Sequence, residues 1–150
     1  MTLLPDRLPQ PLSALATGAG AQFLKFGAVG TVGFLIDTAT VYALRHSVGL
    51  YAAGMLAYLL AASVNWALNR AWTFRGRGHA AAHRQWLRFL AVNLIGFVAN
   101  RGTFVSLIAL VALCAELPVL AVAAGAIAGM LLNFVLSRTL VFPEPKIAAS

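Results

Sequence analysis

The run PVLAVAAGAIAGMLLNFVLSRTLV, residues 118–141, decides the fold, and only one of its side chains, Arg138, carries a charge. A helix needs roughly 20 mostly apolar residues to cross the hydrocarbon layer of a bilayer. Three further stretches of this kind precede it, at residues 22–44, 52–73 and 87–112. The sequence therefore predicts an all-α membrane protein with four transmembrane helices.

The composition of the whole chain supports this prediction. Of the 150 residues, 61% are hydrophobic and 10% are charged, whereas an ordinary soluble domain has about 25% charged residues. A chain this short cannot bury so much apolar surface against itself and still present a polar surface to water. A soluble globular domain is therefore excluded. The single cysteine, Cys114, also excludes a disulfide framework within the chain.

Positive charge is distributed unevenly along the chain, which has 11 Lys and Arg against 4 Asp and Glu. Basic residues near span ends are retained on the cytoplasmic side of a membrane. Arg45 is the basic residue expected on the opposite side. The charge therefore indicates membrane topology and not nucleic-acid binding, and both termini are predicted to be cytoplasmic. The basic residues that predict this orientation are Arg7, Lys25, Arg70, Arg75, Arg77, Arg84, Arg88, Arg138 and Lys146.

The chain divides into a transmembrane domain and two terminal segments. Residues 1–21 contain three prolines and the sequence TGAG at 17–20, which favours a flexible cytoplasmic N-terminal segment. Residues 22–142 form the transmembrane domain, and residues 143–150 form a C-terminal tail. No apolar core of signal-peptide length precedes the first span, so we expect that span to stay uncleaved.

The sequence of the transmembrane domain contains two stretches that align with later stretches of the same domain. Residues 25–34 align with residues 88–97, and NWALNR at 65–70 aligns with NFVLSR at 133–138. These matches predict a tandem repeat of a two-helix hairpin. Because each hairpin crosses the membrane twice, the copies are expected to share one orientation about a pseudo-two-fold axis along the membrane normal. The predicted repeat units are residues 22–75 and 85–142.

Small residues recur at spacings of four in the second and fourth spans. Ala57 and Ala61 align with Gly125 and Gly129. Such pairs let two helix backbones approach closely. We expect these residues to specify helix packing and not chemistry.

Two ionisable residues, Asp37 and Arg101, are expected deep in the apolar layer, where an ionisable side chain costs a few kcal/mol. The repeat aligns Asp37 with Asn100, so Asp37 and Arg101 are predicted at nearly one depth on different helices. An ion pair between them would be either a structural clasp that joins the hairpins or a polar centre that receives a charged or hydroxyl-rich substrate.

A second polar layer is expected nearer the cytoplasm. Asn65 and Asn69 are four residues apart and share a helix face, as do Asn133 and Ser137, and an arginine follows each pair. Amides that face lipid are unfavourable, so both pairs are expected to point into the bundle. The arginines either bind phosphate through paired hydrogen bonds or only anchor helix ends at headgroups. The candidate substrate-binding residues are Lys25, Asp37, Asn65, Asn69, Arg70, Arg88, Asn93, Asn100, Arg101, Asn133 and Arg138.

Catalytic and metal chemistry have little support in the sequence. His79 and His83 share a helical spacing, but a third ligand of the right kind is not close in the sequence. A nucleophile with its base, a carboxylate pair and a phosphate-binding loop are also not recognised. We therefore expect neither an enzyme nor a metal or other cofactor.

The motifs, taken in order, resemble the GtrA-like family of small membrane proteins of bacterial cell-surface polysaccharide synthesis. The resemblance covers nearly all of the four spans, whereas Asp37 and Arg101 depart from the family pattern. It implies that a polyprenyl-phosphate-linked sugar is flipped across the bacterial cytoplasmic membrane to a glycosyltransferase. The residues that carry it are Phe23-Leu24-Lys25-Phe26, Val29-Gly30, Gly33-Phe34, Asn65 to Arg70, Trp72-Thr73-Phe74, Arg88-Phe89, Gly96-Phe97, Asn133-Phe134, Ser137-Arg138 and Phe142.

Under this hypothesis the lipid-linked sugar contacts cations through its phosphate and amides through its hydroxyls. The cations are Lys25, Arg70, Arg88 and Arg138, and the amides are those of Asn65, Asn69, Asn93 and Asn133. One alternative is a non-transporting anchor or accessory subunit for a glycosyltransferase. Another is a small proton-coupled multidrug exporter in which Asp37 binds proton and substrate in turn. Four helices enclose little space, so we also expect a homo-oligomer among membrane lipids.

Overall fold

The computed structural model describes residues 12–144, with side chains from residue 18 onward, and this range is helical apart from short connections. Four helices are long and apolar enough to cross a membrane, which confirms the predicted class of an all-helical membrane protein. These candidate spans are Gly18–Val48, Leu50–Thr73, Ala82–Leu110 and Pro118–Val141.

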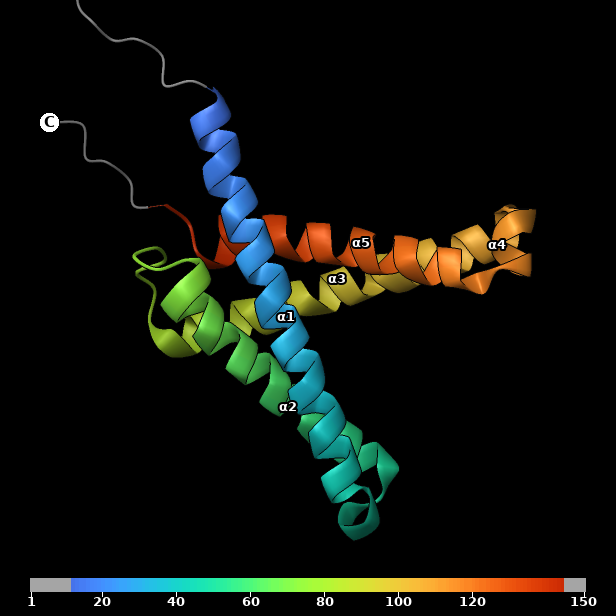
Figure 1. Ribbon diagram of the computed structural model, residues 1–150. Helices are drawn as coiled ribbons and strands as arrows, with labels where there is room; N and C mark the ends of the chain where they lie inside the picture. The colour runs from blue at the N-terminus through green and yellow to red at the C-terminus, as the bar shows by residue number, and fades with distance from the viewer. Residues whose placement is uncertain (1–11, 145–150) are drawn as a thin grey trace, which may run out of the picture.

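The helical elements follow one another with short connections (Figure 1). They are α1 (Leu12–Val48), α2 (Leu50–Leu68), the π-helical turn η1 (Asn69–Thr73), α3 (Ala82–Leu110), α4 (Ala112–Glu116), α5 (Pro118–Leu136) and the π-helical turn η2 (Ser137–Val141). Gly49 alone separates α1 from α2, and its φ of 80° is a conformation that glycine adopts at low cost. Pro118 begins α5, where its missing N–H is not needed.

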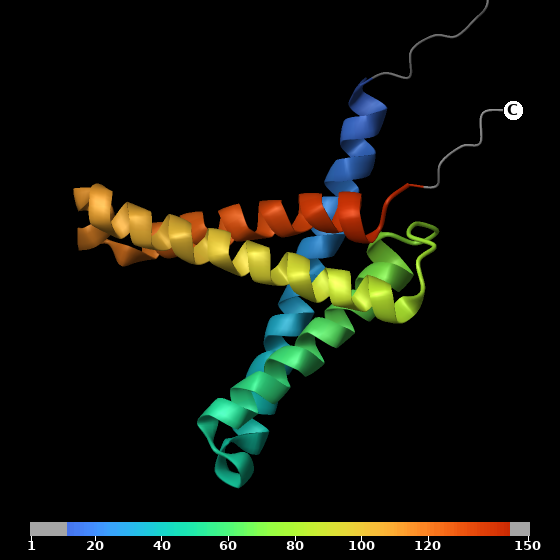
Figure 2. The ribbon, with the colours of Figure 1, turned by 180° about the vertical axis from the view of Figure 1, so that it is seen from behind.

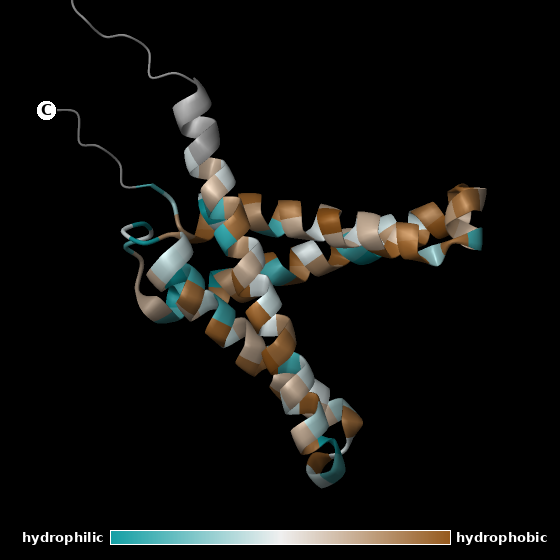
Figure 3. Ribbon diagram, viewed as in Figure 1, coloured by the Kyte–Doolittle hydropathy of each residue, from teal (hydrophilic) through white to brown (hydrophobic). Residues whose placement is uncertain are grey.

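The helices form two hairpins that diverge from a common end (Figures 1 and 2). One hairpin pairs α1 with α2, and the other pairs α3 with α5. The helices of different hairpins contact each other only over short stretches within residues 12–144, where α2 meets α3 and α1 meets α5. The chain is therefore V-shaped and leaves an open angle between its two arms. Figure 3 shows mostly apolar arms and hydrophilic residues near the place where the arms join.

An aromatic cluster holds the two hairpins together at their common end. Phe74 follows η1, Phe142 follows η2, and their rings stack with centroids 4.9 Å apart. Phe134 of α5 also stacks on Phe74, at 6.1 Å, and Phe26 of α1 packs edge-on against Phe134. Buried aromatic rings contribute strongly to packing because each removes a large apolar area from its surroundings.

Small residues set the packing within each hairpin, as predicted. Ala57 and Ala61 are buried in the first hairpin, and Gly125 and Gly129 are buried in the second. A Cβ added to Gly125 would lie 2.6 Å from the carbonyl oxygen of Asn100 in α3. The backbones of α3 and α5 are therefore in direct contact at this position.

Helix α1 begins inside the predicted N-terminal segment. Residues 1–21 were expected to form one flexible segment, but α1 already begins at Leu12. The three prolines of the segment all precede Leu12. A glycine inside a helix costs only about 1 kcal/mol relative to alanine, so the glycines at 18 and 20 do not interrupt the helix. Residues 1–11 lie outside the described part of the chain, as do 145–150 of the predicted tail.

Candidate functional site

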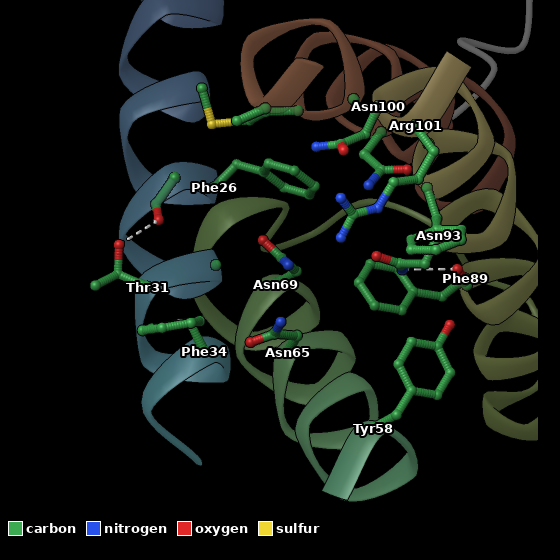
Figure 4. Close-up of a pocket in the computed structure, with 18 residues that line it drawn as sticks. Phe26, Thr31, Phe34, Tyr58, Asn65, Asn69, Phe89, Asn93, Asn100 and Arg101 are labelled. Atoms are coloured by element: carbon green, nitrogen blue, oxygen red, sulfur yellow. Dashed lines mark hydrogen bonds between the residues drawn. The ribbon is translucent and has the colours of Figure 1, made fainter. Parts of the chain in front are cut away.

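A cavity of about 630 Å³ lies in the angle between the two hairpins (Figure 4). Helices α1, α2, α3 and α5 all contribute to its walls. Apolar side chains, among them Phe26, Phe34 and Phe97, form much of the surface. Six of the predicted site residues also line it, and they are Asn65, Asn69, Asn93, Asn100, Arg101 and Asn133.

Two of these amides are held by a matching contact in each hairpin. Asn65 of α2 packs directly against Gly33 of α1, and Asn133 of α5 packs against Gly96 of α3. An added Cβ at either glycine would overlap the asparagine amide. Glycine is thus required at both positions so that the amide can lie flat against the facing helix.

Three amide oxygens in the cavity wall have no hydrogen-bond partner within residues 12–144. They belong to Asn65, Asn69 and Asn133, and each oxygen is buried. A buried polar atom left unsatisfied costs about 1–3 kcal/mol. Native structures contain few such atoms, and a bound ligand is one explanation for them. The three residues line the cavity, so rotation of a side-chain amide would present its oxygen to a ligand hydroxyl.

Arg101 supplies positive charge to the same cavity. Its guanidinium lies 5.6 Å from the centroid of the Phe97 ring on the preceding turn of α3. In Figure 4 this guanidinium extends from α3 toward the side of the cavity that holds Asn69. Asn93 donates a hydrogen bond of 2.8 Å to the carbonyl oxygen of Phe89, which leaves its own side-chain oxygen available. The cavity therefore combines a cation with several amide groups.

The predicted ion pair between Asp37 and Arg101 is wrong. Within residues 12–144 the salt bridges connect Glu144 to Arg77 and to Arg138. Asp37 lies on α1 and Arg101 on α3, and these helices belong to hairpins that separate beyond the aromatic cluster. Arg101 lines the cavity, whereas Asp37 does not. The aromatic cluster, and not an Asp37–Arg101 pair, joins the two hairpins here.

The four cations predicted to bind phosphate lie outside the wall of this cavity. Lys25 is 5.5 Å from the centroid of the Trp72 ring, and Arg88 is exposed on α3. Arg70 donates a hydrogen bond of 2.9 Å to Gln85. Arg138 lies beside Glu144 at the end of the chain's described part.

Gln85 is a central polar residue that the sequence did not single out. It is fully buried near the start of α3 and accepts hydrogen bonds from Arg70 and from the Trp66 indole. Its amide nitrogen donates to the carbonyl oxygens of Gly78 and Val141. Gln85 therefore ties η1, the α2–α3 connection and η2 together. A lone glutamine has no spacing pattern from which this role could be read.

The π-helical turns η1 and η2 were also not predicted. Each closes with an i to i−5 hydrogen bond of 2.8 Å, from the Phe74 N–H to the carbonyl of Asn69 and from the Phe142 N–H to the carbonyl of Ser137. Such turns are rare and frequently occur at functional sites. Here they follow directly on the helix segments that carry the cavity amides.

The fold and this cavity define a multi-pass helical membrane protein with a polar site between two hairpins. A family model described as GtrA/DPMS, transmembrane domain, matches residues 25–142. The chain belongs to this family, which confirms the resemblance drawn from the sequence motifs. No curated protein matches the chain at a significant level.

Proposed function

We propose that the chain flips a polyprenyl-phosphate-linked sugar across the bacterial cytoplasmic membrane and that the sugar phosphate binds in the cavity between the hairpins. Membership in the GtrA/DPMS family indicates a membrane role in the use of polyprenyl-phosphate sugars for polysaccharide synthesis. Translocation, and the cavity as its site, are the specific parts of the proposal.

The observation that carries the proposal is the pairing of unfilled acceptors with a cation in one apolar-walled cavity. Asn65, Asn69 and Asn133 line the cavity, and rotation of their amides presents the unpartnered oxygens to sugar hydroxyls. Arg101 binds the phosphate, because a guanidinium donates paired hydrogen bonds to phosphate oxygens. The phenylalanine rings of the wall receive the first isoprene units of the tail.

Arg101 thus takes the phosphate-binding role that the sequence assigned to four other cations. Lys25, Arg70, Arg88 and Arg138 lie outside the cavity wall and have no direct role in the proposed sugar site. Asn93 and Asn100 complete the set of amides that face the sugar. Asp37 remains on α1 outside the wall, where it has no direct role in this proposal.

The proposed orientation places both termini in the cytoplasm. Four spans return the chain to the side on which it began, and basic residues accumulate at that end. The angle between the hairpins then widens toward the periplasm. The proposed tandem repeat is supported by the matching contacts of Gly33 with Asn65 and of Gly96 with Asn133.

The same proposal includes a homo-oligomer and a glycosyltransferase partner. Between 11% and 22% of each apolar span window is buried inside the chain. Lipid or a second copy must cover the remaining apolar surface, because such surface is unstable in water. A glycosyltransferase on the periplasmic side would consume the translocated sugar.

The charge of the cavity disfavours the alternative of a proton-coupled exporter of cationic drugs. That alternative requires a carboxylate at the binding site, and Asp37 does not line the cavity. Arg101 would instead repel a cationic drug. The second alternative, an anchor for a glycosyltransferase, does not explain why these amide oxygens have no hydrogen-bond partner.

The direct test is a translocation assay in proteoliposomes with a fluorescent polyprenyl-phosphate sugar. The double variant Asn65→Leu with Asn133→Leu removes two hydroxyl acceptors, so we expect translocation to fall by about tenfold or more. Ser106→Leu on the exposed surface of α3, outside the cavity wall, is the matched control and should retain the wild-type rate. A double variant that translocates like the wild type would overturn the proposal.

A second variant separates translocation from anchoring. Replacing residues 79–84 with another helix-compatible polar sequence alters the exposed connection and spares Gly78 and Gln85, which the fold needs. We expect translocation to persist in this variant. Loss of polysaccharide synthesis in cells together with unchanged translocation in vesicles would favour the anchor.

A further inference from the structure

A second cavity, of about 440 Å³, lies at the end of α5 on residues that the proposed sugar site does not use. Its charged residues are Arg77 from the α2–α3 connection, Arg138 from η2 and Glu144 beyond η2. Phe134 forms part of its apolar wall and belongs to the aromatic cluster. The cavity is therefore built on the joint between the hairpins and not on the arms.

Arg77 is held in place by the fold. Its guanidinium lies 5.9 Å from the centroid of the Phe74 ring, and it donates hydrogen bonds of 3.4 Å to Gln22 of α1 and to the carbonyl oxygen of Arg138. The side chain is only 12% exposed. Its Nε is buried and has no hydrogen-bond partner within residues 12–144. The protein encloses this atom, so the part of the cation that a ligand can reach is Nη2, which faces Glu144.

The two arginines converge on one carboxylate. Glu144 lies 3.2 Å from Arg77 and 3.6 Å from Arg138, and its own side chain is 67% exposed. Burial lowers the pKa of Arg77, and the nearby Arg138 acts in the same direction, whereas the Glu144 carboxylate raises that pKa. A negative charge is accordingly favoured at this position. Exposed ion pairs are weak, so a stronger anion can replace the carboxylate.

We infer that Arg77 and Arg138 form a binding site for a phosphomonoester group, which the chain's own Glu144 carboxylate occupies when no phosphate is bound. A phosphate offers three acceptor oxygens and up to two negative charges, whereas the carboxylate offers two oxygens and one charge. Glu144 is therefore an internal competitor that leaves when phosphate binds. This site differs from the cavity of Arg101, and the inference does not depend on translocation.

Two probes distinguish the sources of such a phosphate. Purified protein in phosphatidylcholine nanodiscs is titrated with inorganic phosphate, and in a parallel experiment phosphatidic acid is included in the nanodisc and bound lipid is counted by native mass spectrometry. Binding of both probes indicates a site open to soluble phosphate. Binding of phosphatidic acid alone indicates a lipid headgroup site. Failure of both probes to bind would overturn the inference.

Glu144→Gln is the decisive variant, because it removes the competitor and keeps the side-chain size. We expect the affinity for the phosphate probe to rise about fivefold, since a weak internal ion pair reduces the population of open sites by a similar factor. Arg138→Gln should lower the affinity about tenfold, whereas Arg84→Gln, which removes the same charge from an exposed residue outside the cavity, should not. An unchanged or lower affinity in Glu144→Gln would overturn the inference, as would unchanged binding in Arg138→Gln.

Discussion

The two hairpins share a contact and differ in what surrounds it. Each packs a glycine of one helix against an asparagine amide of the next, through Gly33 with Asn65 and Gly96 with Asn133. The second hairpin, however, contributes Arg101 to the cavity, while the first contributes no cation to its wall. A repeated backbone contact can therefore position equivalent amides while the charge of the site comes from one half alone.

The arginines that end the two hairpins differ in the same way. Arg70 of η1 donates a hydrogen bond to buried Gln85, and its guanidinium lies 5.6 Å from the centroid of the Trp66 ring. Arg138 of η2 contacts an exposed carboxylate at the rim of a cavity. Equivalent positions in the sequence thus have different partners, a buried glutamine in the first hairpin and an exposed carboxylate in the second.

The largest effect on stability is expected from a variant that removes the hydrogen bond between Arg70 and Gln85. Gln85→Leu leaves the donors of Arg70 and Trp66, and the carbonyl oxygens of Gly78 and Val141, without this partner. Unsatisfied buried groups cost about 1–3 kcal/mol each, and some will find water, so we expect a loss of about 3 kcal/mol in all. The thermal unfolding midpoint in detergent measures it. Gln85→Glu keeps the acceptor for Arg70 and should lose less; equal stability of Gln85→Leu and wild type would contradict the role of Gln85.

The next effect tests the closer helix packing of the second hairpin. Gly125→Ala places a methyl group 2.6 Å from a backbone oxygen of α3, and overpacking of this kind costs about 1–3 kcal/mol. The aligned position in the first hairpin, Ala57, already carries that methyl group. Gly102→Ala is the control, because its added Cβ has no heavy atom within 4 Å among the described residues. Since alanine favours helix, the control should be neutral or stabilising, and a stabilised Gly125→Ala would contradict the close packing.

A third prediction compares the two charged residues that the sequence paired. Arg101→Gln should lower the translocation rate about tenfold, because the phosphate loses its charged donor in the cavity. Asp37→Asn should change the rate by less than about twofold, since Asp37 does not line the cavity. The reverse order of these two effects would favour an exporter that depends on Asp37. Both rates come from the proteoliposome assay.

The smallest effect is expected at the end of the second hairpin. Glu144→Gln removes two ion pairs of an exposed carboxylate, and such pairs contribute about 1 kcal/mol or less. The unfolding midpoint should therefore shift little, and raising the salt concentration should reduce the difference further. A loss as large as that of Gln85→Leu would show that Glu144 is a structural residue.

Hydropathy and small-residue spacing predicted the four spans and the close helix contacts, because both depend on local sequence. The amides that face the cavity were also predictable, since lipid-facing asparagines such as Asn65 and Asn133 would be unfavourable. The contact partners of long side chains were not predictable from the sequence. Arg70 and Arg101 can each reach several positions, and the V-shaped arrangement decides which of them faces the cavity. That arrangement depends on the aromatic cluster, whose members lie far apart in the sequence.

The central claim is that one headgroup lies between the two hairpins and contacts both. Photolabelling with a polyprenyl-phosphate sugar that carries a diazirine on the sugar tests it most directly, with adducts mapped by mass spectrometry. We predict adducts on Tyr58 of the first hairpin and on Asn93 of the second, which both line the cavity, and none above background on exposed Val98 outside its wall. Adducts confined to one hairpin, or equally strong on Val98, would contradict the claim.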